Sequence, residues 1–192
     1  MIIYATKQTV ERYGIKMPEE FQEPVMKQIA LDVYNREKGD RLLEWGAKLF
    51  YFDRRKCIQV CNFASKFTVV LVDIKKSELE TAGDLVAGYM LDIYSDDKTM
   101  TALLKQHFKM HPLVIFAKLT DKKIISTMNS FQLTYLNDGY RLYDFIDNGI
   151  LKTRELNRNI NTDYVAREKI NGETKYFFPA EKFAELLKDY YK

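Results

Sequence analysis

Glycine and proline are scarce in this chain of 192 residues, which contains eight and four of them and has no linker, repeat or low-complexity tract. No apolar run approaches the ~18 residues of a membrane-spanning helix. The opening MIIYATKQ lacks the basic start and the long apolar middle of a signal peptide. These absences argue against membrane and secreted proteins, and they predict a single cytoplasmic domain with one substantial core.

Cysteine is also rare, with Cys57 and Cys61 as the only two. Their C-x3-C spacing falls within a predicted strand, where four residues span ~13 Å. That is beyond the ~7 Å that a disulfide allows between Cα atoms. We therefore expect free thiols that pack as small apolar side chains in a reducing compartment. A second pair of metal ligands is missing, so the sequence predicts no metal and no other cofactor.

Familiar catalytic motifs are missing as well: there is no glycine-rich phosphate loop, nucleophile elbow or paired-carboxylate motif. His107 and His111 are one helical turn apart, a spacing that zinc accepts, but Phe108 stands where the metalloprotease motif has glutamate. We expect a surface pair at a helix end. The three aspartates of LDIYSDDK lack the spacing of a calcium loop, and Ser95-Asp96-Asp97 is expected to cap the following helix.

Charge is nearly balanced overall, at +3, and 46% of the residues are apolar, as in an ordinary globular protein. Locally the balance is lost: the net charge is +4 over 51–76, −5 over 77–100, +4 over 101–123 and +2 over 151–160. Solvated turns and a solvated helix face would explain this pattern. A basic edge that binds an anionic partner is the alternative.

Hydrophobic patterning predicts an α+β fold with a mainly antiparallel sheet packed with several helices. The run at 67–74 is apolar on both faces, so we expect helices on both sides of the sheet or a sheet that curls around one. The predicted strands lie at 2–5, in a central meander over 47–74, at 113–119 and in a C-terminal hairpin that turns at Asn171-Gly172.

Helical spacing and capping residues predict the other elements. Pro24 should begin a regular helix that stops at Gly39, and Ser77 with Glu80 matches a capping box. The expected helices cover 6–13, 24–38, 77–93, 99–110, 124–136, 141–160 in two pieces around Gly149, and the C-terminus from Pro179.

The densest charge cluster is Asp53-Arg54-Arg55-Lys56, between two predicted strands. Three cations on a tight turn repel one another, and turn chemistry does not require them. Guanidinium groups grip phosphate or carboxylate in a bidentate fork. Asp53, at the first position of a type I turn in a four-residue loop, would orient one guanidinium or cap the turn. A solvated turn, or an ion pair with the acidic helix, is the structural alternative.

Two further groups could bind an anion. Lys122 and Lys123 precede a predicted helix that carries Asn129. The other group presents two guanidinium forks and an amide on one helix face, at positions i, i+3 and i+4: Arg154, Asn157 and Arg158. Helix capping and simple solvent exposure are the alternatives for both groups.

Several motifs follow one another in a fixed order: Met1-Ile2-Ile3-Tyr4-Ala5-Thr6-Lys7, Trp45-Gly46-Ala47-Lys48-Leu49, Asp53-Arg54-Arg55-Lys56-Cys57, Phe116-Ala117-Lys118, Ser126-Thr127-Met128-Asn129 and Glu155-Leu156-Asn157-Arg158. In this order they resemble a bacterial family of small proteins described as a domain of unknown function. The resemblance covers residues 1–7 and 44–160, and it implies a grouping without an activity. Members of that family often carry histidine after the tryptophan, where this chain has Gly46.

The resembled motifs include polar residues beyond the core positions. If the strands that carry them are neighbours, these side chains would converge near one edge of the sheet: Arg54, Arg55, Lys118, Asn129, Asn157 and Arg158.

The sequence favours a non-catalytic binding or regulatory protein whose basic sheet edge engages an anionic partner, either nucleic acid or an acidic protein surface. The 13 tyrosines and 12 phenylalanines include rings that could stack on bases. Phosphate contacts that do not depend on base sequence would come from Arg54, Arg55, Lys56, Lys122 and Lys123.

Two other hypotheses remain open. An enzyme that processes phosphodiesters or nucleotides would clamp phosphate with Arg54 and Arg55, with Asp53, His107 or His111 as its general base. A protein-directed module, of the kind that mobile elements carry, would use an exposed aromatic patch. An enzyme predicts a concave pocket beside the arginines, whereas a binding protein predicts an open basic face. The oligomeric state is not determined by the sequence.

Overall fold

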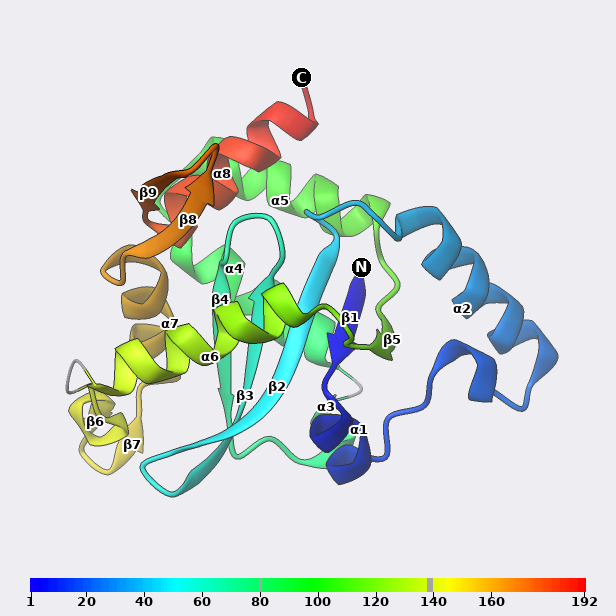
Figure 1. Cartoon of the computed structure of the whole chain (residues 1–192), viewed down its shortest axis with the longest axis horizontal. Coiled ribbons are helices and arrows are strands. Elements are labelled where there is room, and N and C mark those ends of the chain that lie inside the picture. Colours follow the sequence, from blue (N-terminus) through cyan, green and yellow to red (C-terminus); the bar gives the residue numbers. More distant parts are fainter. Residues whose placement is uncertain (80, 138–139) are drawn as a thin grey trace.

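A five-stranded mixed sheet forms the centre of the computed structural model, which describes residues 1–79, 81–137 and 140–192 (Figure 1). The meander β2-β3-β4 is antiparallel, while β1 pairs in parallel with both β2 and β5. The α+β class and the predicted meander are confirmed. In spatial order the strands are β4 (Thr68–Val72), β3 (Arg55–Asn62), β2 (Glu44–Phe52), β1 (Ile2–Ala5) and β5 (Ile115–Lys118).

A helical crossover joins β1 to its parallel neighbour β2. Between β1 and β2 the chain forms α1 (Lys7–Tyr13), the 3-10 turn η1 (Pro18–Glu20) and α2 (Pro24–Glu37). Parallel strands need such long connections, whereas antiparallel strands need only a short turn. As predicted, α2 begins at Pro24.

Two short hairpins stand apart from the central sheet. The hairpin of β8 (Ala166–Ile170) and β9 (Glu173–Phe177) turns at Asn171-Gly172 as predicted, and both turn residues have positive φ. Of the helix expected over 141–160 in two pieces around Gly149, the first piece is wrong: the chain there forms the 3-10 turn η2 (Leu142–Phe145) and the strand β6 (Ile146–Asp147), and β7 (Ile150–Leu151) follows the glycine. Asn148 and Gly149, at φ 49° and 76°, make the same kind of turn.

The remaining helices follow the predicted capping residues in most places. Asp97 accepts the backbone N–H of Met100 at 2.9 Å and so caps α5. The expected cap at Ser77 is wrong, because Ser77 lies inside the helix Lys76–Leu79 and not before it. Glu80, the other half of the expected capping box, lies outside the described residues. The helices are α3 (Lys76–Leu79), α4 (Ala82–Ile93), α5 (Lys98–Met110), α6 (Lys122–Asn137), α7 (Thr153–Thr162) and α8 (Pro179–Tyr190).

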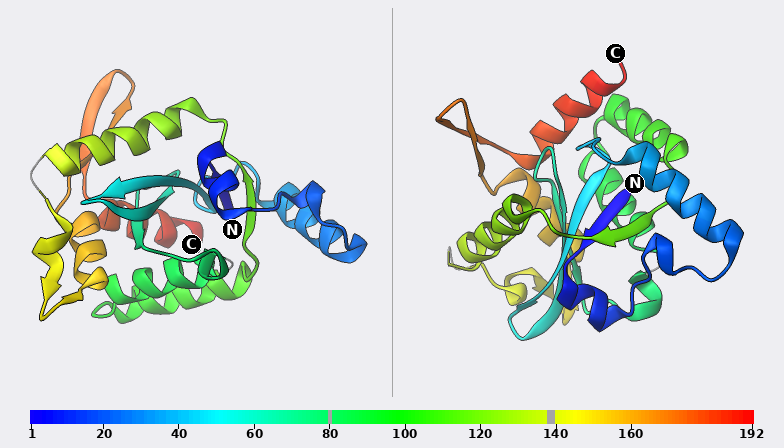
Figure 2. Two further views of the ribbon diagram at one scale, coloured as in Figure 1. Left: turned by 90° about the horizontal axis from the view of Figure 1, so that it is seen from below. Right: turned by 45° about the vertical axis from the view of Figure 1, so that its right-hand side comes forward.

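Helices cover both faces of the sheet, as the two-faced apolar run of β4 predicts (Figure 2, left). On one face, Ile58 and Val69 pack with side chains of α4, α5 and α8. On the other, Cys57 and Val70 pack with α6 and α7, and α2 covers β1 and β5. Cys57 and Cys61 are buried free thiols, as predicted.

The helix α7 is joined to the outer strand β4 by two side-chain amides. Asn161 Oδ1 accepts the backbone N–H of Thr68 at 2.8 Å, and its Nδ2 donates to the Thr68 carbonyl at 2.7 Å. Asn157 repeats this pairing on Val70, at 2.6 and 3.1 Å. Both asparagines are fully buried, so their amides provide the hydrogen bonds that the backbone of this outer strand would otherwise lack.

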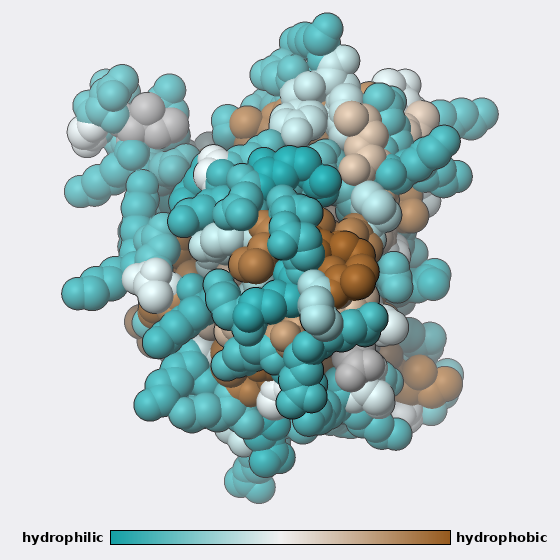
Figure 3. Space-filling view, turned by 90° about the vertical axis from the view of Figure 1, so that its right-hand side faces the viewer, coloured by the Kyte–Doolittle hydropathy of each residue, from teal (hydrophilic) through white to brown (hydrophobic). Residues whose placement is uncertain are grey.

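The helix α2 lies at one side of the molecule (Figure 1) and exposes Val25, Met26 and Ile29. The face on this side is otherwise mostly hydrophilic, with an apolar patch near its centre (Figure 3). No helix among the described residues is both long and apolar enough to cross a membrane.

Candidate anion-binding cleft

The turn between β2 and β3 is tighter than the sequence predicts. Phe52 pairs with Arg55, so only Asp53 and Arg54 form the turn, and both have positive φ, at 47° and 66°. Two left-handed central residues define a type I′ turn, whose twist matches that of the flanking strands. The expected four-residue loop is therefore wrong, and Arg55 and Lys56 belong to β3.

Much of the charge beside this turn is already paired. Arg55 Nε donates to Asp73 Oδ2 at 2.6 Å, and Lys56 Nζ lies 5.3 Å from the centre of the Tyr13 ring. Of the three cations in this cluster, only Arg54 is exposed without an ion pair to any described residue. The cluster thus offers a ligand one unpaired guanidinium rather than three convergent cations.

Asp53 contacts the segment at 141–142 and does not pair with Arg54 or Arg55. Its Oδ2 accepts the N–H of Leu142 at 2.6 Å, and its Oδ1 lies 3.9 Å from Arg141 Nε. The carboxylate therefore ties the β2–β3 turn to η2.

The candidates on α7 divide into surface cations and a buried amide. Arg154 Nη1 lies 3.3 Å from Asp92 Oδ1, while Arg158 donates to the carbonyls of Asp92 at 2.6 Å and Ile93 at 3.3 Å. These carbonyls end α4 and lack helical partners. The prediction of an anion site that includes Asn157 is wrong, because its amide is buried against β4.

The other candidates lie along β5 and α6. Lys118, Lys122 and Lys123 are exposed, and none forms an ion pair with a described residue. Asn129 Oδ1 accepts a hydrogen bond from Lys48 Nζ. The structure thus places the predicted residues in separate regions: the β2–β3 turn, β5 with α6, and the contact of α7 with α4.

A cleft of about 450 Å³ opens between α6 and the β8–β9 hairpin. Its floor comes from β3, β4 and the loop between them. Three cations line it, Lys66, Lys123 and Arg167, and the described lining residues include no carboxylate and no histidine. Of the predicted residues, only Lys123 belongs to this lining.

One face of α6 supplies hydroxyl groups to the cleft. Ser126, Ser130 and Thr134 are exposed and spaced four residues apart, so they form one row along the helix. None of the three hydroxyls has a hydrogen-bond partner among the described residues, whereas Thr127 Oγ1 donates to the Lys123 carbonyl at 3.0 Å. The row therefore offers donors and acceptors to a ligand.

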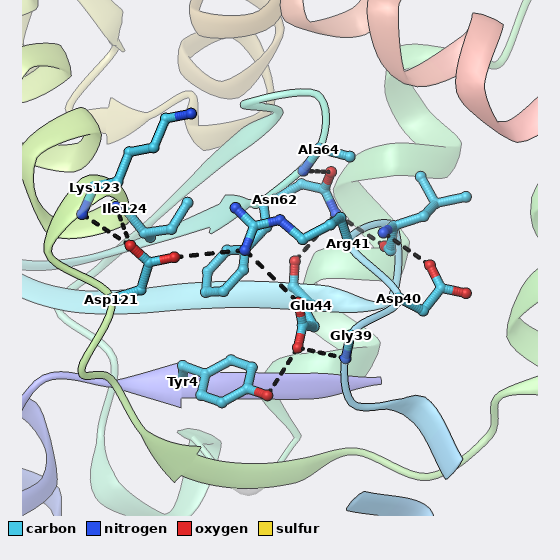
Figure 4. A network of polar contacts seen from close by, with 12 residues as sticks. Tyr4, Gly39, Asp40, Arg41, Glu44, Asn62, Ala64, Asp121, Lys123 and Ile124 are labelled. Carbon is cyan, nitrogen blue, oxygen red and sulfur yellow. Dashed lines mark hydrogen bonds and ion pairs between the residues drawn. The ribbon is translucent and has the colours of Figure 1, made fainter. Parts of the chain in front are cut away.

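Asp121 fixes the start of α6 (Figure 4). Its Oδ1 accepts the N–H groups of Lys123 at 2.8 Å and Ile124 at 3.2 Å, which is an N-cap. Its Oδ2 lies 3.5 Å from Arg41 Nη1. The side chain of Lys123 extends away from this carboxylate in Figure 4, so the cap does not neutralise the lysine amine.

Gly46 on β2 lets α6 lie close to the sheet. A Cβ at this position would be 2.9 Å from the sulfur of Met128 and 3.2 Å from Ile124 Cγ2. The histidine that the resembled family often carries here would collide with α6 in this chain.

The β8–β9 hairpin forms the opposite wall. Arg167 on β8 pairs in register with Tyr176 on β9, so the two side chains are cross-strand neighbours on one face. Both line the cleft, and Tyr176 is 68% exposed. A flat ring and a cation thus face the hydroxyl row of α6.

Lys66 lies at the floor of the cleft and is only 8% exposed. Its Nζ donates to the Phe63 carbonyl at 2.7 Å, and no carboxylate of the described residues lies within ion-pair distance. Burial lowers the pKa of the amine, although Cys61 and Glu168 act in the opposite direction. The backbone is left-handed here, at φ 64°, which is uncommon for lysine. A buried cation without a carboxylate partner is costly and is typical of functional sites.

Sequence analysis missed two of the three cations that line the cleft, Lys66 and Arg167. Each becomes a lining residue only when α6 and the hairpin pack over β3 and β4. The signal that could have been found is the serine and threonine row at 126, 130 and 134, which begins one helical turn after Lys122 and Lys123.

A search of curated proteins finds no match for the chain, and a search of solved structures finds none either. The model of a family described as a domain of unknown function, DUF6933, matches residues 2–182. The match includes the α1–α2 segment and the β8–β9 hairpin, which lie outside the motifs of the resembled family. Because it covers nearly the whole chain, the protein belongs to the DUF6933 family.

Proposed function

We propose that this protein is a cytoplasmic, non-catalytic binding module whose cleft holds the backbone of a single-stranded nucleic acid. The composition of the lining carries the proposal: three cations, a row of hydroxyl groups and, among the described lining residues, no carboxylate. Proteins contact phosphate oxygens with these groups. The free thiols of Cys57 and Cys61 support a reducing location.

A single strand suits this lining better than an acidic protein does. Tyr176 is exposed beside Arg167, and a ring in such a place can stack on an unpaired base. Stacking on an aromatic side chain is worth ~1–3 kcal/mol per base. An acidic protein surface has carboxylates for the cations but no flat bases for the ring.

Processing of phosphodiesters is supported less well. General acid–base catalysis needs a titratable group within reach of the reacting bond. The described lining residues of the cleft include no histidine and no carboxylate, and the amine of Lys66 is buried and donates to the Phe63 carbonyl. The histidines His107 and His111 line a different cavity, and Asp53 is bound to Leu142. The lining therefore favours binding over catalysis.

Two double variants, each of which removes two positive charges, test the proposal. Fluorescence polarisation would follow labelled single-stranded DNA and RNA at ~50 and ~200 mM salt. In Lys123→Ala/Arg167→Ala we expect affinity at low salt to fall at least tenfold. The slope of log affinity against log salt should fall by ~0.7 for each phosphate that the variant no longer neutralises. The matched control, Arg54→Ala/Arg55→Ala, should lose less than about threefold.

Three outcomes would contradict the proposal. Equal losses in the two double variants would mean that overall charge, and not the cleft, governs binding. No binding of DNA or RNA at either salt concentration would exclude a nucleic acid. Binding of a labelled polyglutamate peptide in place of nucleic acid, weakened by the cleft variant alone, would assign the cleft to an acidic protein partner.

A further inference from the structure

A second cavity, of about 200 Å³, lies on the opposite face of the sheet, where α4, α5 and α8 pack. Most of its lining is apolar, including Trp45, Met90 and Phe183. The two histidines of the chain, His107 and His111, also line it. The expectation of a surface pair is wrong, because α8 packs against α5 and buries His107.

One nitrogen of His111 is engaged by a buried carboxylate. Nδ1 lies 3.1 Å from Glu37 Oε1, which also accepts from Arg36 at 2.9 Å, and Glu37 Oε2 accepts from the amine of Met1. Burial opposes ionisation, but these hydrogen bonds hold the pKa of Glu37 below its ordinary value. An ionised carboxylate can only accept, so Nδ1 of His111 carries the hydrogen.

The other nitrogen of His111 has no partner. Nε2 is buried and makes no hydrogen bond with any described residue. In a neutral imidazole with hydrogen on Nδ1, Nε2 is a hydrogen-bond acceptor. His111 lines the cavity whereas Glu37, which engages its Nδ1, does not, and we infer that Nε2 is the edge on the cavity side. A buried acceptor without a donor costs free energy that a ligand can recover.

His107 does not supply the missing donor. Its Nδ1 lies 2.9 Å from the hydroxyl of Tyr191, and burial lowers its pKa to about 4, so the ring is neutral at pH 7. The two histidine rings are 5.1 Å apart between centres. Asp84 also lines the cavity, but it is exposed to solvent. The cavity thus combines mostly apolar walls with one buried acceptor that has no partner among the described residues.

We propose that this cavity binds a small, mainly apolar molecule with one hydroxyl or N–H group, which donates a hydrogen bond to Nε2 of His111. An apolar cavity of ~150 Å³ can hold benzene, so about 200 Å³ leaves room for an aromatic ring with a hydroxyl. Phenol is the simplest probe of this class. The site is separate from the cleft, and its test does not depend on the proposed function.

The single tryptophan of the chain, Trp45, lines the cavity and reports binding. Its indole N–H resonance would be followed by NMR during titration with phenol and with toluene, which replaces the hydroxyl by a methyl group of similar size. The titration is run at pH 8. We expect phenol to bind about tenfold more tightly, although toluene is the more apolar molecule.

Three variants test whether the probes bind in this cavity and whether the preference for phenol depends on His111. His111→Phe should abolish the preference for phenol, and Ala87→Leu, which fills the cavity, should weaken both probes. Gly88→Ala is the matched control, because a Cβ there meets nothing within 4 Å. Equal affinities in the unchanged protein, tighter binding of toluene, or an unmoved Trp45 resonance would each overturn the proposal without any variant. A preference for phenol that persists in His111→Phe would overturn it as well.

Discussion

Two helices present polar faces, α7 toward β4 and α6 toward the cleft, and these faces differ in what their side chains bind. On α7, the amides of Asn157 and Asn161 are buried and fully paired with the backbone of β4. On α6, the hydroxyls of Ser126 and Ser130 are exposed and have no partner among the described residues. A polar helix face is therefore a site candidate only when its groups remain unpaired in the folded chain.

The same distinction applies to the cations. Arg55 and Arg158 are bound to Asp73 and to the end of α4, so their charge supports the fold. Lys66 and Lys123, in contrast, have no carboxylate partner among the described residues and line one cleft. A sequence motif shows which cations are present, whereas the fold decides which of them remain available.

The comparison is tested most strongly at Asn157. In Asn157→Leu, the N–H and carbonyl of Val70 lose their partners while they remain buried. Each unpaired buried group costs ~1–3 kcal/mol, so for two groups we expect the free energy of unfolding to fall by about 2–6 kcal/mol. Urea denaturation followed by circular dichroism measures this change.

Arg154→Ala is the control on the same helix. Arg154 is an exposed residue paired with Asp92, and its loss should change stability by less than ~0.5 kcal/mol. If Asn157→Leu behaved like this control, the amide would not be a structural element of the sheet.

For exposed residues that line the cleft, we expect substitutions to weaken binding without a change in stability. In Tyr176→Ala we expect the affinity for single-stranded oligonucleotides to fall about tenfold, because the stacking surface is removed. Tyr143→Ala removes another exposed tyrosine, on η2 and away from the cleft, and should leave the affinity unchanged. Equal effects of the two variants in a polarisation titration would argue against the cleft.

Replacement of Lys66 should have a small effect on stability, and the effect should be a gain. Because burial lowers the pKa of Lys66, its charged form destabilises the folded state at pH 7. Lys66→Met should therefore raise the melting temperature slightly while it weakens oligonucleotide binding. A variant that loses both stability and affinity would make Lys66 an ordinary structural residue.

The pH dependence of Lys66→Met follows from the same shift. Below the lowered pKa, both the folded and unfolded states carry the proton and the full cost of burial applies. As pH rises through that value toward the ordinary ~10.4 of lysine, the folded protein loses the proton first and gains stability. The advantage of Lys66→Met in thermal unfolding should thus shrink as the pH approaches 10.

Elements specified by local chemistry are predictable from the sequence. Pro24 begins α2, Gly14 ends α1 with φ 58°, and Asn171-Gly172 turns the β8–β9 hairpin. The same Asn-Gly pair at 148–149 predicts only a break between helices. Strands of two residues are too short to show an alternating pattern, so the turn signal has no flanking support there.

The candidate site is less predictable because it depends on contacts between distant segments. Asn157 looks like a surface amide until β4 is placed beside α7. His107 looks like a surface residue until α8 covers α5. Lys66 is one lysine in a short turn, and its burial follows from the packing of α6 and the hairpin. In each case the missing information is which element lies opposite, and spacing along the chain does not contain it.

The paired amides of Asn157 and Asn161 have a consequence for assembly. An open strand edge recruits strands from other chains and is a common starting point for aggregation. Four residues along a helix rise ~6 Å, close to the ~6.8 Å between alternate residues of a strand. One helix face can therefore occupy an edge as a further strand would. The same asparagine spacing could be used in protein design to finish a sheet with a helix.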